Sequence, residues 1–358
     1  MRIKSVEAKL YQVPLNGTYT IALGSMTQVE AVIIRIRTES GLTGLGEAMP
    51  FPPVTGADAE ATLAFVRDLA PALQNYDASE LGGIHTIMDK RSAGYSAAKA
   101  GVDIALYDIL SRRARLPLYR FLGGSNPQVQ TDITITIGST EVMAARAKSF
   151  VEQGFRILKI KAGLDPGEDL AHLRAIREAV GPDVELRIDA NQGWDEKTTL
   201  WALEKMTGLG IVEVEQPLPC WNLEGMRFVR ERITQPLMLD ESVHSPVDAL
   251  KAVKTGAGDI INIKLMKCGG IYKAQKINAI AEAAGLSCMV GCMTETRIAI
   301  TAGAHLAAAL PNIKLADLDG FMEIKDEGCA RGGFTRNGDI LSLGSEPGLG
   351  VNVDFDAL

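Results

Sequence analysis

The sequence has no long apolar run, no basic tract and no Cys-x-x-Cys pair. No segment approaches the roughly 18 consecutive apolar residues that a membrane-spanning helix requires. Residues 1–15 alternate charged and apolar side chains where a signal peptide would have an apolar core. Lys and Arg are spread along a chain of formal net charge −7, which argues against a nucleic-acid-binding protein. We therefore expect a cytoplasmic protein with neither membrane nor nucleic-acid partners.

Cysteine and histidine are also scarce. The five cysteines are odd in number and contain no Cys-x-x-Cys pair, so neither a disulfide framework nor a zinc site is indicated. The four histidines are scattered, and structural roles are the expected interpretation. What remains is an acidic chain of 358 residues, 46% hydrophobic, which can bury one large core and one smaller core.

The first third of the chain has the pattern of an α+β unit. Residues 1–47 alternate in the manner of β-strands, with a break at residues 39–41. Helical spacing follows at residues 57–73 and 96–114. A cluster of Gly and Pro at residues 123–127 then marks a boundary, so residues 1–127 are predicted to form the first domain.

Beyond residue 127, eight short apolar segments alternate with amphipathic helical segments. This alternation predicts a parallel (β/α) barrel of the TIM type over residues 128–320. A doubly wound open sheet is the competing α/β topology, but no glycine-rich phosphate-binding motif follows the first strand. Residues 321–358 have strand-like and turn-like pieces and are expected to pack back on the first domain.

Five charged residues close successive barrel strands. Each one ends an otherwise apolar segment, and neighbours are roughly 25 residues apart, close to the length of one βα unit. Because barrel enzymes place their active sites where the strands end, these side chains are expected to meet at one mouth. They are, in order, Lys161, Asp189, Glu215, Asp240 and Lys264.

The three carboxylates predict a magnesium site. Asp189, Glu215 and Asp240 offer hard oxygen ligands without sulfur or imidazole, which suits one Mg²⁺ per subunit. Asn191 lies two residues beyond Asp189 and can support the metal or its water. Glu213 is the main rival ligand, although it lies deeper and is expected to meet a cation inside the barrel.

The two lysines are expected to stand half a barrel apart. A substrate carboxylate on the metal would present its α-carbon to Lys161 on one face and to Lys264 on the other. One lysine can remove the proton and the other can return it, which inverts the centre. A lysine that acts as a base needs a pKa lowered by a metal, by burial or by a second ammonium group, and Lys159 is the nearby second lysine.

These residues resemble the enolase superfamily in its muconate-lactonizing-enzyme-like subgroup. The similarity spans nearly the whole chain and rests on KIK, DANQGW, EQP, DES and NIKLMKCGG, at residues 159–161, 189–194, 215–217, 240–242 and 262–270. It implies a capping domain over a modified, (β/α)7β-like barrel, with Mg²⁺ on the three carboxylates. It also implies acid/base chemistry by Lys161 and Lys264, and a homo-oligomer.

A pair of aspartates after the eighth strand points to the substrate. Asp317 and Asp319 are separated by one residue, so both can face an ammonium group on the same side. They resemble the Asp-x-Asp of dipeptide epimerases, which implies that they hold the α-ammonium of the substrate's N-terminal residue. Glu295 and Arg297, after the seventh strand, are further candidates for lining this pocket.

Two uncharged stretches are expected to cover the substrate. In this family the specificity loops lie early in the capping domain and near residue 50, and residues 16–29 and 48–56 carry no charge here. An acidic substrate side chain would find no cation there. A hydrophobic C-terminal residue is therefore predicted, covered by Tyr19, Ile21, Met26, Met49 and Phe51.

The leading hypothesis is a Mg²⁺-dependent dipeptide epimerase, an isomerase that inverts the α-carbon of the C-terminal residue. An o-succinylbenzoate synthase or a muconate-type cycloisomerase shares the same metal and lysine framework and is the alternative. A Schiff-base aldolase barrel would leave three carboxylates without a purpose. A non-catalytic binding barrel would gather five ionisable groups at one mouth, at a cost in stability and without a compensating function.

Overall fold

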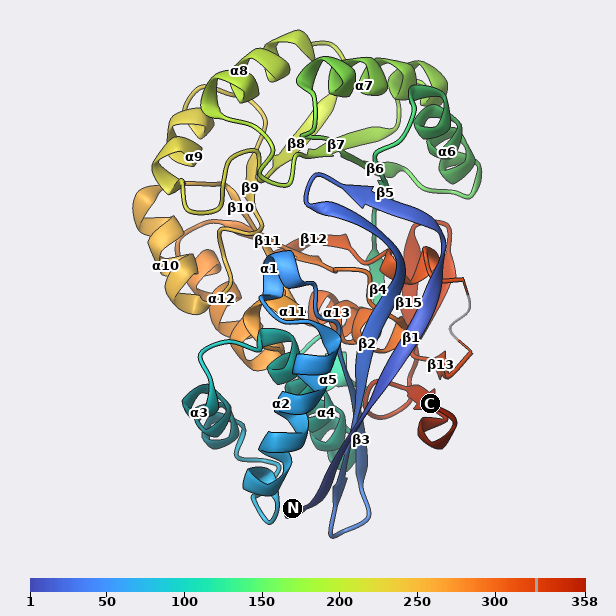
Figure 1. The fold of residues 1–358 in the computed structure, drawn as a ribbon, viewed down its shortest axis with the longest axis vertical. Coiled ribbons are helices and arrows are strands. Elements are labelled where there is room, and N and C mark those ends of the chain that lie inside the picture. The colour runs from blue at the N-terminus through green and yellow to red at the C-terminus, as the bar shows by residue number, and fades with distance from the viewer. Residues whose placement is uncertain (326–327) are drawn as a thin grey trace.

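The computed structural model describes residues 1–325 and 328–358 and contains a capping domain beside a barrel (Figure 1). The cap has a three-stranded antiparallel sheet in the order β1-β2-β3, with helices packed against it. Its strands are β1 (Ile3–Ile21), β2 (Gly24–Thr38) and β3 (Thr43–Ala48). Its helices are α1 (Pro52–Thr55), α2 (Ala59–Leu73), α3 (Leu81–Arg91), α4 (Ser96–Ala114) and α5 (Leu118–Phe121).

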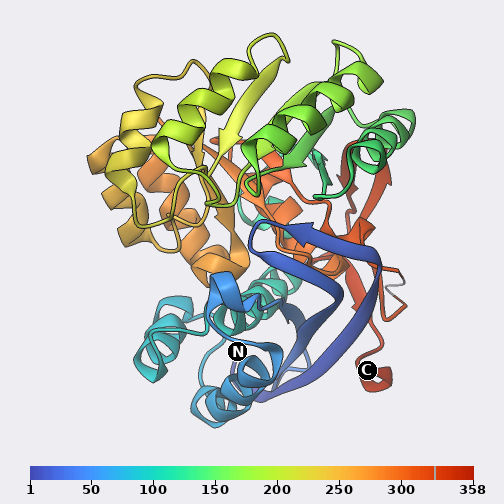
Figure 2. The ribbon, with the colours of Figure 1, turned by 45° about the horizontal axis from the view of Figure 1, so that its top comes forward.

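The β1–β2 hairpin is longer than the sequence suggested. An early loop was expected over residues 16–29, but strand pairing resumes at Tyr19 opposite Met26 and continues to Ile21 opposite Gly24. The register shifts between Pro14 and Tyr19, and the turn itself is confined to residues 22–23. The hairpin tip reaches the ends of the barrel strands, as both ribbon views show (Figures 1 and 2).

The cap sheet lies unusually close to α4. Gly46 of β3 faces Gly101 of α4, and a Cβ at Gly46 would lie 1.9 Å from the Gly101 carbonyl oxygen. Only glycine permits this approach. The sheet covers one side of α4, and α2, α11 (Leu265–Cys268) and α12 (Ile271–Ala283) contact the helix elsewhere, so most of its side chains are buried.

Residues 133–317 form the predicted parallel barrel. In the described ranges, the eight strands run in sequence order from β5 to β12, and a hydrogen bond of 3.1 Å from Asp132 N to Ala316 O joins the two edge strands. The open-sheet alternative is therefore wrong. The strands are β5 (Ile133–Ile135), β6 (Ile157–Lys161), β7 (Glu185–Asp189), β8 (Ile211–Glu215), β9 (Leu237–Leu239), β10 (Ile260–Lys264), β11 (Ser287–Gly291) and β12 (Ile313–Asp317).

Helices between the strands surround the barrel (Figure 1). Two of them begin where capping residues predict. The Asp165 carboxylate accepts hydrogen bonds from the first turn of α7, and the Ser245 hydroxyl does so for α10. The helices are α6 (Thr140–Glu152), α7 (Pro166–Val180), α8 (Glu196–Lys205), α9 (Leu223–Arg230), α10 (Pro246–Thr255), α11 (Leu265–Cys268), α12 (Ile271–Ala283) and α13 (Arg297–Ala309). None of the helices in the described ranges is both long and apolar enough to cross a membrane.

Charged side chains fill a deep layer of the barrel. Lys159, Arg187 and Glu213 are aligned on neighbouring strands, two residues below the layer that closes the strands. Arg187 forms an ion pair of 2.9 Å with Asp132. Burial raises the pKa of Glu213, and the Arg187 charge opposes that shift. Glu213 therefore faces a cation inside the barrel, below the strand ends.

The C-terminal segment contacts both domains. Its strands are β13 (Ala330–Gly332), β14 (Phe334–Asn337), β15 (Ile340–Leu343) and β16 (Val351–Val353), and β15 pairs with β4 (Gln128–Gln130). Leu118 N in the cap donates a hydrogen bond of 2.9 Å to Gly348 O. Leu349 N donates one of 2.8 Å to the Asp108 carboxylate of α4.

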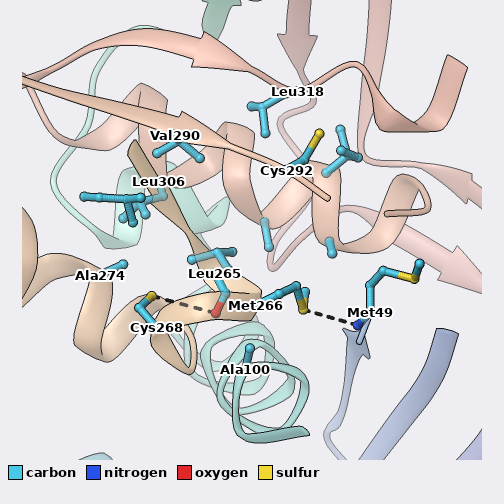
Figure 3. Packing of buried hydrophobic residues seen from close by; sticks show 14 of the residues in the cluster. Met49, Ala100, Leu265, Met266, Cys268, Ala274, Val290, Cys292, Leu306 and Leu318 are labelled. Atoms are coloured by element: carbon cyan, nitrogen blue, oxygen red, sulfur yellow. Dashed lines mark hydrogen bonds between the residues drawn. The ribbon is translucent and has the colours of Figure 1, made fainter. Parts of the chain in front are cut away.

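Hydrogen bonds made by carboxylates and by a backbone N–H of the cap fix its position on the barrel. Asp103 of α4 accepts a hydrogen bond from Ile271 N at the start of α12, and Glu47 of β3 accepts bonds from Thr296 N and Ala299 N at the start of α13. Such bonds satisfy the free N–H groups of a helix N-terminus. Between them, Met49 N contacts the sulfur of Met266 at 3.2 Å (Figure 3).

Candidate active site

Three carboxylates converge where consecutive strands end. Asp189 closes β7, Glu215 closes β8 and is paired with it in register, and Asp240 follows β9 directly. One carboxylate oxygen from each residue lies within 4.8 Å of the other two, and all three residues are buried. The local sequence creates this arrangement because parallel strands end at the same edge of the sheet.

The two lysines lie on opposite flanks of this carboxylate cluster. Lys161, on β6, places its Nζ 2.6 Å from Asp189 Oδ2. Lys264, on β10, places its Nζ 2.8 Å from Asp240 Oδ2. Both side chains line the same cavity. Burial alone would lower the pKa of Lys264, but the Asp240 carboxylate raises it overall.

Lys159 lies beneath the cluster and connects it to Asp317. Its Nζ is 3.1 Å from Asp189 Oδ2, 2.8 Å from Glu215 Oε2 and 2.9 Å from Asp317 Oδ2. Burial opposes its charge, but these carboxylates raise its pKa overall. Lys159 is therefore a buried ammonium group that compensates the negative charge.

The carboxylate cluster fits a hard divalent cation. Burial, followed by the charges of Asp189 and Asp240, raises the pKa of Glu215 to about 8. Two further buried oxygens near the cluster have no hydrogen-bond partner, namely Asn191 Oδ1 and Glu241 Oε2. A divalent ion among these oxygen donors would relieve the repulsion, and an all-oxygen set suits Mg²⁺.

The aspartate pair predicted from the sequence, Asp317 and Asp319, borders the same cavity. Asp317 ends β12, and its Oδ1 is buried without a hydrogen-bond partner. Asp319 Oδ2 accepts a hydrogen bond of 2.6 Å from Thr134 N, and its Oδ1 accepts one of 3.7 Å from the Cys292 thiol. Burial, followed by the Asp317 charge, raises the pKa of Asp319 to about 7. Asp317 Oδ1 is thus available to a cationic ligand, and Asp319 Oδ1 accepts a weak bond from a thiol and keeps further acceptor capacity for such a ligand.

Residues of the cap form an apolar wall of this cavity. The hairpin supplies Tyr19, Ile21, Leu23 and Met26, and the segment around α1 supplies Met49, Phe51 and Val54. The cationic side chains that line the cavity are Lys161 and Lys264, both from the barrel. The wall therefore offers apolar contact without a positive charge.

The structure does not bring Glu295 and Arg297 to the cavity lining. Arg297 begins α13 and donates hydrogen bonds to the carbonyl oxygens of Gly332 and Phe334 at 3.1 and 3.0 Å. Glu295 is buried, and its carboxylate accepts a hydrogen bond of 2.6 Å from Met293 N. Burial, followed by the Glu47 charge, raises the pKa of Glu295 to about 8.

Sequence reasoning missed two residues that contact the cluster, Lys267 and Asn262, and one that contacts Asn191 beside it, Glu241. Glu241 accepts a hydrogen bond of 3.1 Å from Asn191 Nδ2. Lys267 contacts the Asp240 carboxylate, and Asn262 Nδ2 donates a bond of 2.7 Å to Glu215 Oε1. Glu241 and Lys267 sit inside the DES and NIKLMK motifs, so their proximity in sequence to Asp240 and Lys264 was the available signal.

A capped parallel barrel whose strand ends gather carboxylates and lysines is the architecture of a barrel enzyme with its active site at that mouth. Family comparison agrees with the architecture. The mandelate racemase / muconate lactonizing enzyme N-terminal domain matches residues 5–123, and the enolase C-terminal domain-like family matches residues 142–357. The chain belongs to the mandelate racemase / muconate lactonizing enzyme group of the enolase superfamily.

Relatives that align with nearly the whole chain include proteins named as dipeptide epimerases. A hydrophobic dipeptide epimerase of Enterococcus faecalis is 44% identical over 98% of this chain and 100% of the relative. An L-Ala-D/L-Glu epimerase of Bacillus subtilis is 42% identical over 98% of this chain and 97% of the relative. The crystal structure of the dipeptide epimerase of E. faecalis complexed with Mg and L-Leu-L-Tyr is similar to this chain with a TM-score of 0.96. It is 45% identical, over 98% of this chain and 100% of that chain.

Proposed function

We propose that this protein is a Mg²⁺-dependent dipeptide epimerase that inverts the α-carbon of the C-terminal residue and prefers hydrophobic dipeptides. The observation that carries the proposal is one cavity lined by Lys161, Lys264, Asp317 and Asp319. The two lysines are acid/base groups on two sides of the cavity, where the α-carbon of a dipeptide can lie between them. The two aspartates at one end match its α-ammonium group. Relatives named as dipeptide epimerases, aligned over nearly the whole chain, support it.

Asp189, Glu215 and Asp240 would hold the metal ion, with Asn191 and Glu241 beside them. When bound, Mg²⁺ supplies the positive charge that lowers the cost of forming an enediolate from the substrate carboxylate. It would also neutralise the carboxylates that raise the pKa of Lys264, which favours the free amine that a base requires.

The lysines then divide the proton transfer. Lys161 and Lys264 approach the reaction centre from strands on opposite sides of β7, β8 and β9. One amine takes the α-proton from one face, and the other ammonium group delivers a proton to the opposite face. Asp317 and Asp319 would hold the substrate α-ammonium through their Oδ1 atoms, which fixes the α-carbon between the lysines.

The apolar wall supports a hydrophobic substrate. Ile21, Met26 and Phe51 line the cavity, and the cap offers no cation to pair with an acidic side chain. An acidic C-terminal residue would therefore lose its hydration without a partner. This distinction matters because the relatives include both hydrophobic-dipeptide and L-Ala-D/L-Glu epimerases.

Proton exchange with solvent tests the proposal. The protein with Mg²⁺ is incubated in D₂O with a library of L,L-dipeptides, and mass spectrometry follows deuterium at the C-terminal α-carbon. Incorporation with inversion, greatest for hydrophobic C-terminal residues, is expected. The absence of exchange with every dipeptide would overturn the assignment.

We further propose that the protein is a cytoplasmic homo-oligomer. Exposed apolar side chains, such as Trp221 in the loop after β8 at 78% exposure and Val247 of α10 at 61%, support contact with another copy. Cell fractionation and light scattering of the purified protein test the two statements, and a monomer at all concentrations would contradict the second.

A further inference from the structure

Gln216 follows the ligand Glu215 directly and has an unusual backbone. It is fully buried and has a φ of +35°, in the left-handed region that residues other than glycine rarely adopt. A strained residue persists when its surroundings fix it, and such residues concentrate at functional sites. The contacts of Gln216 explain what fixes it.

The side chain of Gln216 connects the end of β8 to the end of β9. Its Oε1 accepts hydrogen bonds of 2.9 Å from Asp240 N and 3.2 Å from Ser242 N. Its Nε2 donates bonds of 2.9 Å to Leu218 O and 2.9 Å to Ser242 Oγ. Both ends of the amide are therefore fully used, and one of its partners is the backbone of the ligand Asp240.

The backbone of Gln216 reaches the remaining ligand strand. Its carbonyl oxygen accepts a hydrogen bond of 2.7 Å from Gln192 N, in the turn that follows Asp189 on β7. Its own N–H donates a bond of 2.9 Å to Met238 O on β9. A single residue thus joins the ends of the three strands that carry Asp189, Glu215 and Asp240.

We infer that Gln216 is a positioning residue for the metal site, which holds the three carboxylates at the spacing that Mg²⁺ requires. It offers no atom to the ion and acts through the peptide groups that carry the ligands. Mg²⁺ demands near-ideal octahedral geometry, so small shifts among ligands weaken its binding. This inference rests on the metal site of the proposed function.

Gln216→Met tests it, because methionine has a similar length and volume but cannot form these hydrogen bonds. We expect the Mg²⁺ dissociation constant, measured by isothermal titration calorimetry, to rise about 10–100-fold, the usual effect of losing a residue that orients metal ligands. We also expect most of the Mg²⁺-induced rise in melting temperature to disappear, relative to the same variant in EDTA.

Two further variants separate positioning from general stability. Ser242→Ala removes one partner of the Gln216 amide and should weaken Mg²⁺ binding by a smaller factor, which keeps the test valid if Gln216→Met does not fold. Gln275→Met removes a different glutamine contact, the 2.9 Å hydrogen bond from the Tyr107 hydroxyl. It should lower the melting temperature without changing the affinity for Mg²⁺.

The outcomes distinguish the inference from the proposed function. If the parent protein binds Mg²⁺ and Gln216→Met binds it within about threefold of the parent, a difference below the 10–100-fold expected of an orienting residue, Gln216 is only a structural residue. If Gln216→Met does not fold, an unchanged affinity in Ser242→Ala overturns the inference. If the parent itself does not bind Mg²⁺, the proposed metal site is wrong.

Discussion

The Nζ of Lys159 lies 2.9 Å from Asp317 Oδ2, and this ion pair connects the metal-binding carboxylates to the pair proposed to hold the substrate ammonium. The same amine is 2.8 Å from Glu215 Oε2. Both carboxylates and the amine are buried. The two halves of the proposed site are therefore electrostatically coupled through one cation.

Replacing Lys159 with methionine should destabilise the protein. Removing one partner of a buried ion pair leaves uncompensated charge and costs about 3–5 kcal/mol. We expect a loss of this size in the free energy of unfolding, measured by urea denaturation in EDTA. Lys148→Met, at an exposed position of α6, is the matched control. Equal stability of the two variants would contradict the compensating role of Lys159.

Single substitutions of the two lysines should show that each lysine acts on a different face of the α-carbon. In Lys161→Ala and in Lys264→Ala, we expect epimerisation to fall by about 10²–10⁴-fold, the usual contribution of a general acid or base. Each variant should still exchange the α-proton of one epimer with D₂O, and the two variants should retain opposite epimers. Proton NMR measures both rates. Retention of the same epimer by both variants would show that the amines act from one side.

Neutralising Asp317 or Asp319 should weaken recognition of the substrate amine. A hydrogen bond to a charged group contributes about 1.5–3 kcal/mol, so Asp319→Asn should reduce kcat/KM for a free dipeptide by about 10–150-fold. Asp183→Asn, at an exposed position, is the control. Steady-state kinetics give kcat/KM for a free dipeptide and for its N-acetyl derivative, which lacks the charged amine. Unchanged turnover in Asp317→Asn and Asp319→Asn would favour the cycloisomerase or o-succinylbenzoate synthase alternative.

The contribution of His305 to stability should be lost as the pH decreases from about 6.5 to about 4. Burial lowers the pKa of His305 from 6.5 to about 4, and its Nδ1 accepts a hydrogen bond of 3.0 Å from Tyr119 N. Between pH 6.5 and pH 4, His305 binds a proton in the unfolded chain but not in the folded protein. The stabilisation present above pH 6.5 is therefore lost progressively as the pH falls to about 4. The loss amounts to about 3 kcal/mol for this group.

The measurement is urea denaturation at several pH values with the parent and with His305→Asn. Asparagine can accept the same hydrogen bond through its side-chain oxygen and does not titrate, so the stability of the parent relative to this variant should decrease by about 3 kcal/mol over this interval. A parallel pH dependence in the parent and the variant would show that other groups are responsible.

A cation placed on the hairpin should change the preferred substrate. Met26 lines the cavity and is partly exposed. Met26→Arg should raise kcat/KM for L-Ala-L-Glu by about fivefold, as expected for a partly exposed ion pair of roughly 1 kcal/mol, and lower it for L-Ala-L-Leu. Met26→Gln, which adds polarity without charge, is the control. An equal gain with Met26→Gln would exclude charge as the cause.

The barrel and its charged mouth were predictable because they depend on periodic features. Strand ends meet at one edge and side chains alternate, so the intervals between Lys161, Asp189 and Glu215 were sufficient to bring them together. The contacts of Gln216 and Asn191 were not predictable, because they depend on left-handed backbone conformations at +35° and +40° that the sequence does not signal.

Arg297 illustrates the same limit. It follows the seventh strand and was expected to line the pocket, but it is the first residue of α13. The direction of that helix sends its guanidinium group toward Phe334, 4.4 Å from the ring centroid. Which way a side chain leaves a loop depends on how the next element is oriented, and that orientation is set here by contacts with the cap such as Glu47 with Ala299 N.

The cavity wall and the reacting groups come from separate stretches of the chain. The apolar wall is contributed by residues 19–54, whereas the ionisable groups lie between residues 161 and 319. Mutations in a short N-terminal stretch can therefore exchange one substrate preference for another while the proton-transfer apparatus is inherited intact. After gene duplication, one copy can acquire a new substrate preference while it keeps the residues that transfer the proton.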